Sequence, residues 1–155
     1  MAAVRSPGRE VRAGKVTWVL RGRFLRCKLP SGRCLSYFKP KVSMKTTDWG
    51  PKMSLSFMSV DSVTRKWIRT FTYGGSLVEN ITQAIARDLM AWAMLRLETK
   101  GIYDLVLSVH DELIAEIEPG ASDARTFAAI MSEIPKWGLG CPVSAEAFQC
   151  TRYRK

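Results

Sequence analysis

The sequence predicts an α+β protein in which an antiparallel sheet has two main helices packed on one face. The long segment 76–99 has the 3.6-residue apolar period of an amphipathic helix, and residues 123–134 repeat that period over a shorter span. Several other stretches alternate apolar and polar residues and are separated by turn signals, which is typical of strands joined by hairpins. Two helices and a set of hairpins together give the predicted fold class.

The first half of the chain predicts the hairpins. Residues 1–14 are rich in Arg, Gly and Pro and are expected to form a flexible basic lead-in, whereas residues 15–29 fit either a helix or strands. Leu29–Arg33 has Pro in its second position and Gly in its fourth, which favours a tight turn. The remaining expectations are strands at 34–38, 55–60 and 67–72, a basic loop at 39–52 and a turn at Asp61-Ser62.

The segment 76–99 contains the strongest helix signals. Ser76 and Glu79 have the spacing of a capping box, and Lys100-Gly101 is a C-terminal stop. Asn80, Gln83 and Arg87 fall on one face, because steps of three and four residues return to the same side of a helix. These three side chains form either a functional stripe or an ordinary solvated one. The predicted apolar face comprises Val78, Ile81, Ile85, Leu89 and Trp92.

A second hairpin is predicted over residues 103–118. Tyr103–Val109 is a nearly continuous apolar run that suits a buried strand, and residues 113–118 alternate apolar and acidic side chains. His110, Asp111 and Glu112 lie between them as a polar tip. Adjacent carboxylates repel each other unless a cation joins them, and Mg²⁺ prefers oxygen ligands. A last strand is expected at 142–148.

Charge divides the chain into two different halves. The whole chain has 24 Lys and Arg against 14 Asp and Glu, a formal net charge of +10. Residues 1–75 contain 16 of these basic residues and 3 of the acids, whereas residues 76–155 contain 8 and 11. This asymmetry suits nucleic-acid contact in the first half and carboxylate chemistry in the second, although a solvated basic arm would have the same composition.

Several classes of protein do not fit the sequence. No apolar run approaches the roughly 20 residues that span a bilayer, and the basic N-terminus lacks the apolar stretch of a signal peptide, so we expect no membrane partner and a cytoplasmic location. The four cysteines do not have the spacing of a common zinc site, which favours free thiols.

The motifs in combination resemble family A (polymerase I-like) DNA polymerases of the phage type. Residues 73–88 (YGGSLVENITQAIARD) followed by 109–113 (VHDEL) are similar to the helix and the motif C hairpin of that family. Residues 29–37 (LPSGRCLSY) and the closing segment from Pro142 to Tyr153 also resemble it. The resemblance covers roughly residues 28–155 and implies that residues 15–155 form part of a polymerase palm domain.

The resemblance implies roles for individual residues. Asp111 would be a catalytic carboxylate that binds metal, and Glu112 would support it. His110 would contact the primer terminus. Gln83, with Arg87 and Asn80, would touch the minor groove of the template–primer DNA, where contacts can check base-pair geometry without reading sequence.

The family's other essential parts have no match in this chain. The Asp-x-Ser-x-x-Glu segment of motif A is absent, and the spacing of Lys66 to Tyr73-Gly74 is a coincidental likeness to the nucleotide-binding fingers helix. A second chain or a missing N-terminal region is therefore expected to supply motif A and the fingers, with Mg²⁺ and deoxynucleoside triphosphate bound only in the complete site. We expect the chain to be inactive alone, as a split subunit, a truncated gene product or an excised fragment. The alternative functions are a non-catalytic basic DNA-binding module and an inactive polymerase remnant.

Overall fold

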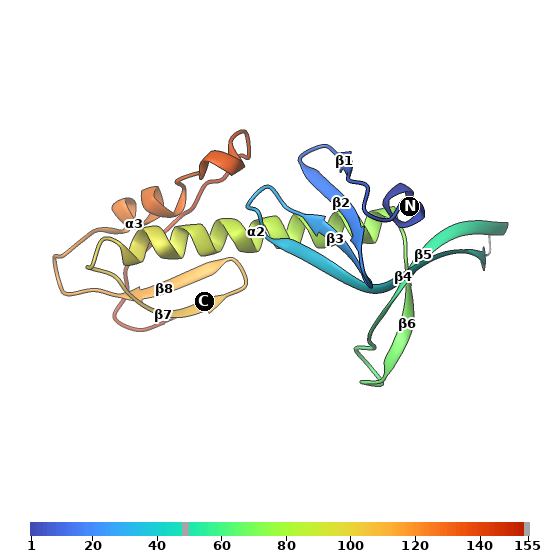
Figure 1. Ribbon diagram of the computed structural model, residues 1–155. Helices are drawn as coiled ribbons and strands as arrows, with labels where there is room; N and C mark the ends of the chain where they lie inside the picture. The colour runs from blue at the N-terminus through green and yellow to red at the C-terminus, as the bar shows by residue number, and fades with distance from the viewer. Residues whose placement is uncertain (48–49, 154–155) are drawn as a thin grey trace. The chain divides into compact units, whose positions relative to one another are not determined.

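The computed structural model describes residues 1–47 and 50–153 of the chain, and its elements are shown in Figure 1. They divide into two compact units, Met1–Ile85 and Ala86–Lys155. None of the helices in the described part is long and apolar enough to cross a membrane. The elements in chain order are α1 (Ala2–Arg5), β1 (Val11–Ala13), β2 (Val16–Arg21), β3 (Phe24–Lys28), β4 (Cys34–Thr47), β5 (Gly50–Val60), β6 (Trp67–Thr72), α2 (Gly74–Glu98), β7 (Asp104–Val109), β8 (Glu112–Glu116), α3 (Ala124–Met131) and a short 3-10 helix, Lys136–Gly138.

The first unit is built on a six-stranded antiparallel sheet in which every strand pairs with its neighbours in the chain. Residues 15–29, which the sequence left open between helix and strand, form β2 and β3. Leu25 lies opposite Tyr37 on the face that packs with Leu55 into the main core. The Tyr37 ring is 5.9 Å from that of Trp18 and 4.9 Å from that of Phe57. Burial of such side chains stabilises the sheet by about 1.5–3 kcal/mol each.

The turn predicted at Leu29–Arg33 joins β3 to β4. The Gly32 amide donates to the Leu29 carbonyl over 2.9 Å, and the Leu29 amide donates to the Arg33 carbonyl over 2.8 Å. Gly32 has a φ of +92°, which glycine adopts without steric cost. The Arg33 guanidinium donates to the Ala84 carbonyl of α2 over 2.8 Å. The turn therefore connects the sheet to a helix far along the chain.

The prediction of a loop at 39–52 is wrong for every residue of that segment that the structure describes. Residues 48 and 49 lie outside the described part of the chain. β4 continues to Thr47 and β5 starts at Gly50, with Val42 paired to Leu55 and Met44 to Met53. The basic and turn-forming residues made this segment resemble a loop, although exposed lysines also suit a strand with one face in water. The register shifts between Phe38 and Lys41, where Lys39 has a φ of +46°.

Residues 1–14, expected as a flexible lead-in, contain α1 and β1. The Gly8 amide donates to the Leu20 carbonyl over 2.9 Å, and Val11 pairs with Trp18. Ala3 is buried against the core around Leu25. Pairing to β2 gives these backbone groups partners that composition alone does not reveal.

The long helix α2 confirms the predicted helix at 76–99, but its start differs. The Leu77 amide donates to the Tyr73 carbonyl over 3.1 Å, so Ser76 lies inside the first turn and the predicted capping box is wrong. The helix also takes in Gly74 and Gly75, ahead of the predicted start at residue 76. Its buried positions also differ from the prediction, because Val78 is 63% exposed while Ala84 is buried beside Cys27. A small alanine permits this close approach to the strands.

The second unit packs around Leu97, Tyr103 and Ile130. The Tyr103 ring meets Phe127 edge-on at 5.2 Å, and its hydroxyl shares a 2.6 Å hydrogen bond with Ser122. α3 starts as predicted, because the Asp123 carboxylate accepts from the Thr126 amide over 2.6 Å, which lowers the pKa of Asp123. It ends at Met131, earlier than the predicted 134.

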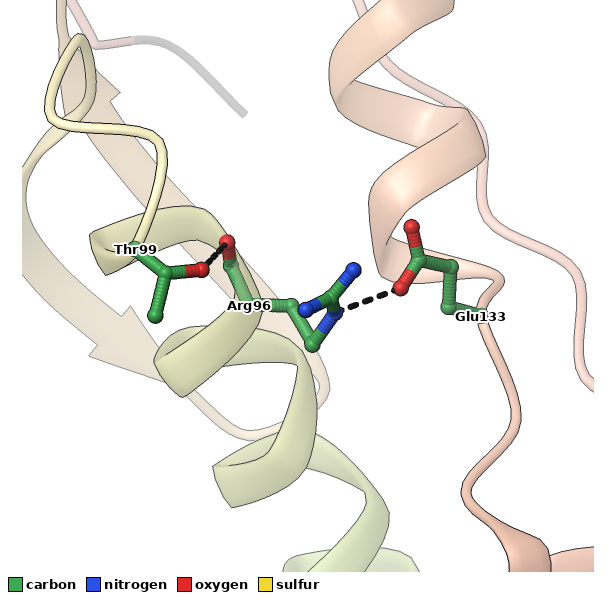
Figure 2. Close-up of polar contacts among 3 residues, drawn as sticks. All are labelled: Arg96, Thr99 and Glu133. Carbon is green, nitrogen blue, oxygen red and sulfur yellow. Dashed lines mark hydrogen bonds and ion pairs between the residues drawn. The ribbon is translucent and has the colours of Figure 1, made fainter.

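Figure 2 shows two polar contacts of Arg96 in α2, one with Glu133 after α3 and one with Thr99 just past the end of α2. Arg96 Nε donates to Glu133 Oε2 over 2.6 Å, and the Thr99 hydroxyl donates to the Arg96 carbonyl over 2.8 Å. The hydrogen bond to Glu133 and the charge of that carboxylate raise the pKa of Arg96. Both side chains remain partly exposed to water, so this pair orients the segment more than it stabilises it.

Two strand predictions in the second unit need correction. β7 is not a buried strand, since Val106 and Leu107 are 49% and 48% exposed. β7 and β8 form a sheet of their own with two strands, which buries less of each strand than a larger sheet would. The strand predicted at 142–148 is absent, and the Ala145 amide donates instead to the Ser132 hydroxyl over 3.0 Å. An alternating pattern of apolar residues favours a strand, but the strand forms only where another strand is available for pairing.

The contrast between Cys27 and Cys34 gives a first testable prediction. Cys27 is fully buried, and burial together with the nearby Cys34 raises its pKa to about 11, whereas Cys34 is exposed. The thiolate is the reactive species, so a short maleimide pulse at pH 8 should modify Cys34 and leave Cys27 intact until denaturant is added. Mass spectrometry of peptides gives the readout, and equal rates at the two thiols would contradict the placement of β3.

Candidate functional site

The predicted polar tip lies at the turn between β7 and β8. Val109 pairs with Glu112, so His110 and Asp111 are the two residues of the connection. The prediction of a hairpin at 103–118 with His110, Asp111 and Glu112 at its end is confirmed for the backbone. All three side chains are exposed. The turn therefore presents an imidazole and two carboxylates together to solvent.

His110 has an unusual backbone conformation for its position. Its φ is +52°, in the left-handed region that non-glycine residues seldom occupy. Two-residue hairpin connections with positive φ at the first central residue normally place glycine there. The left-handed conformation costs an L-residue roughly 1–2 kcal/mol. Such outliers gather at binding and catalytic sites, but Lys39 and Arg65 have similar φ values, so the conformation of His110 counts only together with the polar residues beside it.

The Glu112 carboxylate has a partner that the sequence did not indicate. The Tyr153 hydroxyl donates to Glu112 Oε2 over 3.3 Å, which brings the end of the described chain to the tip. The two residues are 41 positions apart, and no periodicity or local motif relates them. Asp111 makes no comparable side-chain hydrogen bond to any residue that the structure describes, so the two neighbouring carboxylates differ in their surroundings.

The three polar residues predicted on one face of the helix lie on α2 and are exposed. Asn80 Nδ2 donates to the Tyr37 hydroxyl over 3.4 Å, and Gln83 Nε2 donates to Glu79 Oε1 over 3.4 Å. Burial raises the pKa of Tyr37, and the hydrogen bond from Asn80 opposes that shift. Asn80 and Gln83 belong to the first unit, whereas Arg87 and the tip belong to the second.

The tip offers part of a magnesium site. Carboxylate oxygens suit Mg²⁺, which commonly uses one or two carboxylates and completes its octahedron with water and substrate phosphates. Asp111 and Glu112 supply two such groups. Within residues 1–47 and 50–153, no group of three or more His, Cys, Asp or Glu side chains is placed to hold a metal ion. The donor set therefore fits Mg²⁺ only if further oxygens come from elsewhere.

The backbone strain at His110 predicts that glycine is the more stable residue there. We expect His110→Gly to raise the free energy of unfolding by about 0.5–1 kcal/mol, because the relief of strain outweighs the added freedom of the unfolded chain. Ser108→Gly, on an exposed β7 residue without positive φ, is the matched control and should lower it by about 0.5–1 kcal/mol. Urea denaturation gives both values, and a His110→Gly variant less stable than the parent would contradict the prediction.

The exposure of Asp111 predicts that its charge is not needed for folding. Asp111→Asn should leave the melting temperature unchanged or slightly raised, because it removes repulsion with Glu112. Leu97→Ala, in the fully buried centre of the same unit, should cost about 2–5 kcal/mol. Melting curves of both variants and the parent provide the comparison. If Asp111→Asn melted as early as Leu97→Ala, the aspartate would be a determinant of the fold.

Comparison with known proteins shows what the chain is similar to. It is 38% identical over 140 residues to a protein named DNA polymerase from Bacillus phage SP02. The match covers 90% of this chain and 21% of that polymerase. No family model matches the chain, and no solved structure matches it. The chain thus spans about a fifth of the length of the curated relative it matches, and over that fifth it is similar to a phage DNA polymerase.

Proposed function

We propose that this chain is a C-terminal palm portion of a DNA-directed DNA polymerase of the polymerase I-like, family A type. The observation that supports this most strongly is the similarity to a phage DNA polymerase over 90% of the chain. The exposed tip with His110, Asp111 and Glu112 supports it independently, because it presents metal-binding oxygens on a strained turn. A protein that only bound DNA would have no evident need for two carboxylates there.

Each tip residue has a distinct role in the proposed activity. Asp111 is the metal-binding catalytic carboxylate, as the resemblance of residues 109–113 to motif C implies, and its exposed side chain is accessible to a metal ion. Glu112 assists from the adjacent position, where the Tyr153 hydroxyl holds one of its oxygens. His110 contacts the primer terminus.

The helix α2 supplies the proposed contacts to the template–primer duplex. Gln83 and Arg87 are exposed and can donate to minor-groove acceptors, which occupy similar positions in every base pair. Asn80 already donates to Tyr37, so a contact from Asn80 to DNA would compete with that hydrogen bond. We therefore assign Gln83 and Arg87 the larger share of the duplex contact.

The reaction needs groups beyond the tip. In the complete active site, Mg²⁺ would neutralise the charge that develops on the transferring phosphoryl group and its oxygens. Asp111 and Glu112 would hold part of its coordination sphere and keep those oxygens oriented toward the primer. A further aspartate and the groups that bind the nucleoside triphosphate would come from a region outside these 155 residues.

The surface of the second unit is consistent with a further polypeptide region packing against it. Val106 and Leu107 of β7 are each about half-exposed, although the sequence is as apolar there as in a buried strand. Exposed apolar side chains that cluster in one element often mark an interface. A missing part of the polymerase would cover them and bring the second aspartate to the tip.

A chimeric polymerase tests the proposed function. The region of the phage SP02 polymerase that matches this chain is replaced by this chain, and template-dependent primer extension is measured with Mg²⁺. We expect activity in the chimera, a loss of at least about 100-fold with Asp111→Asn because a metal-binding carboxylate is gone, and little change with Asp104→Asn. Asp104 is the matched control, since it is an exposed carboxylate at the other end of the same strand.

Two results would contradict the proposal. One is a folded chimera, with a cooperative melting transition, that fails to extend a primer. The other is a chimera in which Asp111→Asn and Asp104→Asn are equally active. The isolated chain should extend no primer in the same assay, because the tip alone offers too few groups to bind metal and nucleotide together.

A further inference from the structure

Strands β3 to β6 present one continuous face, here called the outer face, on the side opposite the core residues Leu25 and Leu55. Paired residues in neighbouring strands lie on the same face of a sheet. Phe24 pairs with Phe38, Phe38 with Met58 and Met58 with Arg69, so these four form one row across the strands. Alternation then places the residues two positions away on the same side. The further members are Arg26, Lys28, Cys34, Ser36, Lys41, Ser43, Lys45, Lys52, Ser54, Ser56, Val60, Trp67 and Phe71, of which Ser56 is fully buried.

A β-bulge keeps this face continuous along β4. Phe38 pairs with Met58 and Lys41 pairs with Ser56, so three steps on β4 match two steps on β5. In a regular strand, three steps would turn the side chain to the opposite face. The extra residue of the bulge compensates for this, so both Phe38 and Lys41 face outward. Arg69 stabilises the bulge, since one of its guanidinium nitrogens donates to the Lys39 carbonyl over 3.0 Å and to the Ser56 hydroxyl over 3.3 Å.

Aromatic rings gather on the outer face and remain accessible. The Phe24 and Phe38 rings have centroids 5.0 Å apart, and Trp67 lies 6.2 Å from Phe38. Phe24 is 38% exposed, Trp67 55% and Phe71 42%. Lysines lie against two of the rings, with Lys39 Nζ 5.5 Å from the Phe38 centroid and Lys45 Nζ 4.9 Å from that of Phe71. A soluble protein has no structural need to leave such rings uncovered.

The charge of the same strands has a single sign. β3 to β6 contain no Asp or Glu, and they contain seven Lys or Arg residues: Arg26, Lys28, Lys39, Lys41, Lys45, Lys52 and Arg69. Such a surface complements a polyanion and repels a basic partner. Basic residues interleaved with exposed aromatic rings are the arrangement that binds single-stranded nucleic acid, because unpaired bases stack on the rings while cations follow the phosphates.

We propose that the outer face of the six-stranded sheet binds single-stranded DNA. Bases stack on Phe24, Phe38 and Trp67, and the phosphates lie along the lysines and arginines on either side of that row. Duplex DNA does not fit this role, because its bases already stack on one another and offer no free ring face. The choice of DNA over RNA rests on the proposed function. This surface shares no residue with the tip or with the minor-groove contacts proposed for α2, and it would hold an unpaired strand.

Fluorescence anisotropy with a labelled 15-nucleotide oligo(dT) tests the proposal on the whole chain. Phe24→Ala and Trp67→Ala should each weaken binding about tenfold, in line with the loss of one stacked base. Phe148→Ala is the matched control and should change nothing, since Phe148 is 67% exposed in the other unit. Affinity falls as salt concentration rises, and Arg26→Ala and Lys28→Ala should each make the slope of log affinity against log salt less negative by about 0.7.

A second measurement needs no variant. Cys34 is exposed and lies on the outer face opposite Lys28, so bound oligo(dT) should slow its alkylation, while the exposed Cys150 in the other unit should react as before. Three results would overturn the proposal: unchanged affinity in both aromatic variants with Cys34 unprotected, equal or tighter binding of a duplex of the same length, and a single-stranded RNA bound tenfold more tightly than the DNA.

The oligo(dT) binding experiment and the chimera experiment can fail independently of each other. Oligo(dT) binding that depends on Phe24 and Trp67, together with an inactive folded chimera, would retain the single-strand surface and remove the polymerase assignment. An active chimera whose parent chain does not bind oligo(dT) would retain the polymerase assignment and remove this surface.

Discussion

Neighbouring residues of a β-strand point to opposite faces, and the first unit depends on that alternation in every strand of its six-stranded sheet. This alternation places Leu25, Tyr37 and Leu55 in the core and turns their neighbours in each strand outward. The same geometry leaves Phe24 and the basic residues of β3 to β6 on the other side. One core and one exposed surface therefore follow from a single period, so a change of register in one strand would disturb both.

Local signals in the sequence predicted an element correctly where the folded chain also provides the strand partner that the element needs. The turn at Leu29–Arg33 and the strand at 67–72 were found from residue type alone, because glycine, proline and alternation act within a few positions. Strands were predicted at 34–38 and 55–60, but their continuation into the segment predicted as a loop was missed, since lysines in an exposed strand resemble those in a loop. The absent strand at 142–148 was the opposite case, an alternating segment with no edge on which to pair.

The candidate site shows the same division between local and distant information. His110, Asp111 and Glu112 were predicted at a hairpin tip, because the apolar runs on either side bracket them directly. The contact from Tyr153 to Glu112 joins residues 41 positions apart, and the hydrogen bond from Asn80 to Tyr37 joins residues 43 apart. Both depend on how separate elements pack, which side-chain chemistry and spacing do not specify. The positive φ of His110 was likewise not predicted, since a histidine between two strands does not by itself indicate that conformation.

The contacts that α2 makes within the first unit have a consequence for synthesis of the chain on the ribosome. All six strands precede the helix, yet the inner face of the sheet is covered in part by Leu77, Ile81, Ala84 and Ile85. The hairpins can pair as they emerge, but Val16 and Leu29 keep an open apolar side until the helix has left the exit tunnel. At about 5–20 residues per second this interval lasts seconds, long enough for exposed apolar surface to attract other chains. The bond from Arg33 to the Ala84 carbonyl forms only after that interval, and it marks the point at which the nascent sheet is no longer exposed on that side.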